Sequence, residues 1–171
     1  MTIFGGNDAV FIQDETAGTF FRPEPGQHFA PGDYLEVIGH TQPGLYLPGI
    51  YLSTAVPQPV RVLDRRPLPA PIPVRFADLV SGRYHYQRVA LEGVVRSVEL
   101  QSEPPADLTG SVSAPGHFPR TVLRLLVDGR SIEIRTDAGL DARPGPPAVG
   151  SRVRVVGLAA GSINPRRQLI Q

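Results

Sequence analysis

Short runs in which apolar and polar residues alternate dominate the hydrophobic pattern of this chain. Two of these runs share one frame, residues 32–39 and residues 150–157, with a glycine at each end and a period-2 pattern between. In the first frame Leu35 and Val37 fall on one face of a strand and Glu36 falls on the other. The same frame at two matching places in a longer series of strands predicts an internal duplication.

A β-hairpin is expected ahead of each frame. Its strands are residues 10–14 and 19–22 in the first half of the chain, and residues 122–127 and 131–135 in the second half. The second pair is joined by Asp128-Gly129, a dipeptide favoured in two-residue hairpin turns. One more strand follows each frame, at residues 50–55 and 167–170. Five short strands in this order predict a small Greek-key barrel of the OB type in each half.

The opening strand of each expected barrel differs in length. In the second half residues 88–98 form a long strand in which Val89, Leu91, Val94 and Val98 are apolar, with Gly93 at the point where a barrel strand bends. In the first half the matching place holds residues 1–4 alone. The first barrel is therefore expected to lack part of its first strand, as if the chain began inside a domain.

A proline-rich segment separates the two halves. Residues 57–73 contain six prolines, which favour an extended and stiff backbone. We therefore expect an all-β protein of two tandem OB-like five-stranded barrels. The expected domains are a first barrel at residues 1–60, a connector at residues 61–75 and a second barrel at residues 76–171. A single helical turn is expected at residues 76–81.

Composition narrows the classes of partner. The chain has 171 residues, is 41% apolar and carries a net charge of +1, so no global field draws it to nucleic acid or to an anionic membrane. All 17 basic residues are arginine, which we interpret as codon bias in a GC-rich genome in preference to a dedicated anion site. No cysteine is present, which excludes disulfides and thiolate zinc sites. No signal peptide or membrane span is expected within the chain.

The chemistry of the sequence does not predict an enzyme. Nucleotide-binding glycine loops and the nucleophile motif G-x-S-x-G are absent. The four histidines, His28, His40, His85 and His117, are dispersed, and each is expected in or beside a loop. Asp14 and Glu15 are better explained as turn residues than as an acid–base pair. We therefore expect no metal, no cofactor and no catalytic residue.

The first hairpin offers one set of candidate ligand contacts. Alternation assigns Val10 and Ile12 to the core face. The opposite face would then carry an aromatic, amide and cationic set consisting of Phe11, Gln13, either Phe20 or Phe21, and Arg22. Of the two phenylalanines, Phe21 is the candidate ligand contact. OB barrels bind single strands with such sets. The near-zero net charge favours the competing interpretation, in which Phe11 and one of the other two phenylalanines pack against the connector or the other barrel.

A second set of candidates lies in the segment Tyr84-His85-Tyr86-Gln87-Arg88. Tyr84, Tyr86 and Arg88 could contact a ligand where the two barrels meet. The favoured interpretation is the start of an amphipathic strand, whose tyrosine rings cover the core while their hydroxyl groups stay in water. In the second half the matching hairpin has charged residues and no aromatic residue, so no stacking platform is expected there. Its charged residues are Arg124, Arg130, Glu133 and Arg135.

The order of these motifs resembles the extracytoplasmic OB-like region of certain bacterial sensor histidine kinases. The motifs that carry the likeness are residues 11–18, 32–39, the proline-rich connector, and residues 79–82, 89–96, 153–157 and 164–170. The resemblance implies a non-catalytic sensory or interaction module in the periplasm or outside the cell, ahead of a membrane span and a kinase that lie outside this chain. It implies an unidentified small ligand or protein partner and no particular binding residue. The alternative is an OB-fold protein that binds single-stranded nucleic acid.

Overall fold

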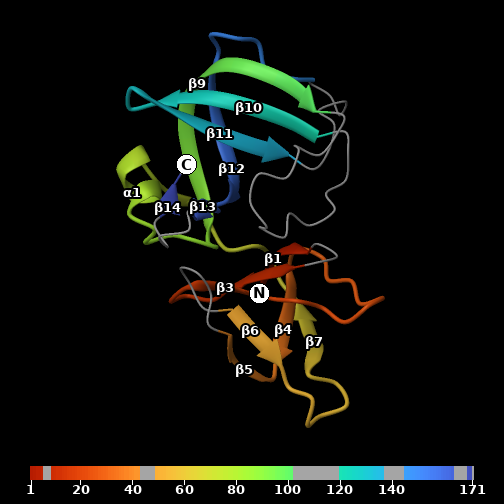
Figure 1. Ribbon diagram of the computed structural model, residues 1–171. Coiled ribbons are helices and arrows are strands. Elements are labelled where there is room, and N and C mark those ends of the chain that lie inside the picture. Colours follow the sequence, from red (N-terminus) through yellow and green to blue (C-terminus); the bar gives the residue numbers. More distant parts are fainter. Residues whose placement is uncertain (6–8, 43–48, 102–119, 137–144, 164–168, 171) are drawn as a thin grey trace. The chain divides into compact units, whose positions relative to one another are not determined.

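The computed structural model describes residues 1–5, 9–42, 49–101, 120–136, 145–163 and 169–170, and these residues are mostly β-strand (Figure 1). The β-rich class expected from the alternation pattern is confirmed. The chain divides into two compact units, Met1–Ala90 with Val156–Gln171, and Leu91–Val155. This division differs from the expected one, because the turn segment and the first residues of the long strand at residues 88–101 belong to the first unit.

The first unit contains a five-stranded sheet with the order β1-β2-β3-β6-β5. Its strands are β1 (Thr2–Gly5), β2 (Val10–Gln13), β3 (Gly18–Phe21), β5 (Gly39–Gln42) and β6 (Gly49–Leu52). The expected hairpin is present as β2 and β3, and its turn is stabilised by the Asp14 carboxylate, which accepts the backbone N–H of Thr16 at 2.8 Å and of Ala17 at 3.0 Å. β3 and β6 are parallel, so a crossover connection joins them.

β4 (Asp33–Val37) and β7 (Val60–Arg65) form a separate antiparallel two-stranded sheet in the first unit. β7 lies where the sequence predicted the beginning of a connector, so that expectation was wrong for residues 61–65. The physical reason is local: the stretch between Pro59 and Pro67 has no proline and can donate its N–H groups to a partner strand. Val60 is also buried, which fixes the strand to the core.

The core of the first unit is built on three buried residues, Val10, Phe21 and Val60. Partly buried apolar side chains pack around them: Ile12, Phe29, Leu35, Val37, Ile50 and Leu52. The assignment of Val10 and Ile12 to the core face is therefore confirmed. A short β8 (Ile72–Pro73) and the expected helical turn, α1 (Phe76–Val80), follow; the Asp78 carboxylate accepts the backbone N–H of Arg75 at 2.8 Å at its start.

The second sheet has the order β11-β10-β9-β12, with β8 beside β9. Its main strands are β9 (Arg88–Gln101), β10 (Arg120–Val127), β11 (Arg130–Thr136) and β12 (Arg152–Leu158). The two-residue turn between β10 and β11 has positive φ at both Asp128 (49°) and Gly129 (77°), as a type I′ hairpin requires. This confirms the hairpin predicted from the dipeptide.

The last two strands, β13 (Ser162–Ile163) and β14 (Leu169–Ile170), form a small separate pair. The expected final strand at residues 167–170 is present in its last two described residues; residues 167 and 168 lie outside the described part of the chain. Among the described residues none of the sheets is closed into a barrel. No helix in that part of the chain is long and apolar enough to cross a membrane.

Candidate functional site

The strand registers assign the side chains of the first sheet to its two faces. Phe21 on β3 is the register partner of Ile50 on β6, and Ile50 is the partner of Thr41 on β5. Register partners share a face, and so do residues two apart on one strand. Because Phe21 is fully buried, these residues and Thr19 lie on the core face.

The outer face carries aromatic rings on four neighbouring strands. Phe11 on β2 and Phe20 on β3 are register partners, and their ring centroids lie 6.1 Å apart. Tyr51 on β6 and His40 on β5 are also partners, with centroids 5.5 Å apart. The Phe20 ring packs over Gly49, where an added Cβ atom would lie 2.8 Å from it. We call Phe11, Phe20, Tyr51 and His40 the aromatic row.

Half of the aromatic row is covered by Tyr86 from the same unit. The Tyr86 ring centroid lies 5.1 Å from that of Phe11 and 5.5 Å from that of Phe20, which it meets edge-on at 71°. Such tilted and edge-on geometries are the favourable ones for aromatic pairs. Burial raises the pKa of the Tyr86 phenol, so the ring is neutral at pH 7. In this half of the aromatic row, Phe11 and Phe20 pack against the protein itself, as the favoured interpretation of the sequence expected.

Tyr86 is held in place through its backbone. Its φ of 61° lies in the left-handed region, which costs a non-glycine residue roughly 1–2 kcal/mol. The backbone N–H of Tyr86 donates to the Ala159 carbonyl oxygen at 2.7 Å. Its carbonyl oxygen packs against Gly18, where an added Cβ atom would lie only 2.1 Å away. These contacts stabilise a conformation that an isolated chain would avoid.

Gln13 and Arg88, both candidates for ligand contact, bond to the protein itself. The backbone N–H of Arg88 donates to the Gln13 side-chain oxygen Oε1 at 2.8 Å, and Gln13 is only 8% exposed. The Arg88 guanidinium donates to the carbonyl oxygen of Pro69. Tyr84 is half-buried, and the guanidinium carbon of Arg83 lies 5.4 Å from its ring centroid. The segment of residues 84–88 is therefore held by contacts within the first unit.

Phe21 is the candidate that the structure removes from the outer face. It is the register partner of Val10 in the core, is 0% exposed and lies 5.7 Å from the Phe29 ring centroid. The choice of Phe21 over Phe20 as the outer-face candidate was therefore wrong, because Phe20 is the residue that pairs with Phe11. Arg22 follows directly after β3 and is exposed.

His85 is buried beside Tyr86, with the two ring centroids 4.0 Å apart. It is 4% exposed, and desolvation lowers the pKa of its imidazole to about 4. The ring is therefore neutral at pH 7. The sequence placed His85 near a loop, and it does lie in the turn segment before β9, but its burial was not predicted.

The other half of the aromatic row is open to solvent. Tyr51 is 50% exposed, and His40 is also exposed. The sequence predicted His40 in or beside a loop, whereas it lies on β5. The run Gly39-His40-Thr41-Gln42 has no apolar residue, so it lacks the periodic signal that identifies a half-buried strand. Sequence reasoning therefore missed both His40 and Tyr51.

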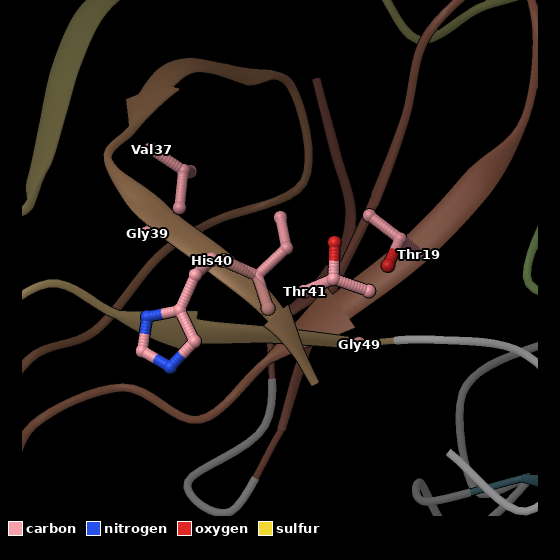
Figure 2. Close-up of a pocket in the computed structure, with 7 residues that line it drawn as sticks. Thr19, Val37, Gly39, His40, Thr41 and Gly49 are labelled. Atoms are coloured by element: carbon pink, nitrogen blue, oxygen red, sulfur yellow. The ribbon is translucent and has the colours of Figure 1, made fainter. Parts of the chain in front are cut away.

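A hollow of about 310 Å³ lies at the same strands and includes their core face (Figure 2). The residues that line it are Thr19, Val37, Gly39, His40, Thr41, Gly49 and Ile50. It contains two hydroxyl groups and no carboxylate or guanidinium. The His40 imidazole points away from Thr19 and Thr41, as its place on the outer face requires. The volume lies at the lower end of small-molecule pockets.

The described hairpin of the second unit has a charged exposed surface, as predicted. Glu133 forms ion pairs with Arg124 at 3.8 Å and with Arg135 at 2.8 Å. Exposed pairs of this kind contribute little to stability, typically less than about 1 kcal/mol. β10 and β11 contain no aromatic residue, so among the described residues the clustered aromatic rings belong to the first unit.

Within the described ranges no group of three or more histidine or acidic side chains is close enough to hold a metal ion. His117 lies outside those ranges. A scan against protein-family models, a search of curated proteins and a search of solved structures each give no match for this chain.

Proposed function

We propose that this chain is a non-catalytic binding module of the sensory or interaction type, and that its ligand binds the open half of the aromatic row. One observation carries the proposal: the sheet presents rings on four adjacent strands, and the pair on β5 and β6 is exposed while the other pair is covered. Exposed aromatic residues on a rigid sheet supply contact area at a low entropic cost. They are the type of surface on which binding energy concentrates.

We propose further that each half of the chain is OB-like. The strand order β12-β9-β10-β11 supports this proposal for the second half, because a Greek key places its fourth strand beside its first. In the first half the support is the parallel pair of β3 and β6, which requires a crossover, and the contact between β1 and β4 at the far edge of the sheet. OB folds are partly open Greek-key barrels.

The sensory role rests on the order of the sequence motifs. In this proposal the module lies in the periplasm or outside the cell, and a membrane span and a histidine kinase follow it in a longer protein. The flanking gene sequence tests this part. We expect it to encode a signal sequence or membrane span and a kinase; a reading frame with neither would overturn the sensory role and leave the binding proposal standing.

Binding of single-stranded nucleic acid is the second candidate, since the aromatic row is of the kind on which bases stack. The distribution of charge speaks against it. The four residues of the row carry no carboxylate or guanidinium. One exposed cation, Arg22, follows Phe20 by two residues, whereas Arg61 and Arg65 of β7 are paired with Glu36 and Asp33. A groove that follows a phosphate backbone needs several unpaired cations.

A titration followed by nuclear magnetic resonance tests the binding proposal. The ¹⁵N-labelled full chain is titrated separately with octathymidylate, maltotetraose and an uncharged tyrosine-containing peptide. We expect the peptide or maltotetraose to cause saturable shifts at the backbone amides of β5 and β6, whereas shifts by octathymidylate alone would favour the second candidate. If all three leave these amides unchanged at millimolar concentration, the proposed binding site is wrong.

A further inference from the structure

The open half of the aromatic row adjoins β5, for which the described residues show a partner strand on one side. β5 stands at the end of the sheet order, and its described pairing is with β6 on one side. The backbone groups on the other side of an edge strand are available to a further strand. An extended polypeptide can use such groups, because its own N–H and C=O groups repeat with the same spacing. A saccharide or a nucleotide has no such repeat.

The covered half of the row shows what kind of side chain this face accommodates. Tyr86 places a neutral phenol ring against Phe11 and Phe20, at centroid distances of 5.1 and 5.5 Å. The polypeptide that carries Tyr86 is fixed at the same time by hydrogen bonds of its backbone, one of them from Tyr86 to Ala159. One aromatic side chain on a hydrogen-bonded backbone therefore already binds this face from within the chain.

The surface at His40 and Tyr51 continues that arrangement on the next two strands. Gly49 lies between Phe20 and Tyr51 on the outer face and is covered by the Phe20 ring, which leaves no room for a side chain there. Neither Gly39, His40 and Thr41 of β5 nor Gly49, Ile50 and Tyr51 of β6 carries a carboxylate or guanidinium. A charged partner would therefore find no countercharge among them.

We propose that β5 and β6 dock an extended, uncharged polypeptide segment of a partner protein. Its backbone adds to the side of β5 that has no partner strand among the described residues, and one of its aromatic side chains stacks on Tyr51 and His40. This inference rests on the proposed function, because it names the partner of the same surface. It adds the class of partner, a protein segment, and the two contacts that select it.

A peptide pair tests the inference. The first probe is an acetylated and amidated pentapeptide of serine and threonine with tyrosine at its second and fourth positions, and the second has alanine at both positions. In titrations of the ¹⁵N-labelled full chain we expect the tyrosine peptide to shift the amides of residues 39–41 and 50–52, and the alanine peptide to bind about tenfold more weakly. A version of the tyrosine peptide with alternate N-methylated amides should also bind about tenfold more weakly, because methylated amides cannot donate the backbone hydrogen bonds to β5.

Two variants of the chain test whether binding depends on this surface. Tyr51→Ala should weaken binding of the tyrosine peptide about tenfold. Tyr84 lies outside this surface, so Tyr84→Ala should change the affinity less than about twofold. Equal binding of the tyrosine and alanine peptides would overturn the inference. So would shifts of the same amides by maltotetraose alone, which would leave the proposed function standing, or by octathymidylate alone, which would favour the nucleic-acid candidate instead. If no probe shifts these amides, both fail.

Discussion

The side chain of Gln13 accepts a hydrogen bond from the backbone N–H of Arg88, 75 residues further along the chain. The donor–acceptor distance is 2.8 Å, and Gln13 is 8% exposed. Through this bond the first hairpin holds the segment that carries Tyr86 over Phe11 and Phe20. Two residues that sequence reasoning treated as ligand contacts therefore bind each other within the first unit.

Removing the acceptor of this bond should destabilise the chain. In Gln13→Leu the Arg88 N–H is left without its partner in a partly buried setting, which costs about 1–3 kcal/mol of the free energy of unfolding. Urea denaturation measures the loss. Gln27→Leu is the control, because the Gln27 side chain accepts the Glu24 N–H at 3.1 Å in an exposed turn. We expect a loss below about 0.5 kcal/mol for the control. Equal losses for the two variants would show that the bond between Arg88 and Gln13 contributes no more to stability than an exposed one.

Gly18 should tolerate no side chain. The Cβ atom of Gly18→Ala would lie 2.1 Å from the Tyr86 carbonyl oxygen, a backbone atom that cannot rotate away. The segment must then shift, and we expect a loss of at least about 3 kcal/mol in urea unfolding, or a chain that does not fold. A variant with near wild-type stability would mean that Gly18 and Tyr86 are not in close contact.

The stability of the protein should fall in mild acid because of His85. Its folded-state pKa is about 4, below the ordinary value of 6.5, so the unfolded state binds the proton first as the pH falls. The stabilisation is fully present above about pH 6.5 and is lost as the pH falls from there toward 4. Between these two pH values, the free energy of unfolding should fall by up to about 1.4 kcal/mol per pH unit because of this one group.

Unfolding curves between pH 4 and 7.5 measure this dependence. The variant His85→Gln should lose the part of the slope that comes from this histidine, whereas His28→Gln, which changes an exposed residue, should keep it. The assignment to His85 would be refuted by identical pH profiles for the wild type and His85→Gln.

The hairpin turn of the second unit needs its glycine for conformational reasons alone. Gly129 has a φ of 77°, and an added Cβ atom would meet nothing within 4 Å. Gly129→Ala should therefore cost about 1–2 kcal/mol through the left-handed backbone. Gly157→Ala is the matched control, since its surroundings are also open and its φ is not in that region. The turn geometry would be wrong if both variants were equally stable.

The strands that carry an apolar alternation were predictable from the sequence. The hairpin of β2 and β3, the long β9 and the turn at Asp128 and Gly129 agree with their patterns, because each has local chemistry that points to one structure. β7 was missed because the prolines on both sides of it drew the whole segment into a connector. β5 was missed because a polar edge strand has no periodic signal.

The binding surface was less predictable than the fold. Alternation placed Phe11 on the outer face correctly, but it left Phe20 and Phe21 as alternatives, and the register with Val10 is what distinguishes them. The pairing of His40 with Tyr51 depends on how two strands meet, which one strand's pattern cannot reveal. The role of Tyr86 depends on contacts with residues more than sixty positions away.

The central claim is that the aromatic row is covered at Phe11 and Phe20 and open at Tyr51 and His40. Proton relaxation by a soluble paramagnetic agent, measured together with nuclear Overhauser effects, tests it most directly. We predict strong relaxation of the Tyr51 ring protons, weak relaxation of those of Phe11 and Phe20, and Overhauser effects from the Tyr86 ring to both phenylalanines. Equal relaxation of all these rings, with no Overhauser effect from Tyr86, would contradict the account.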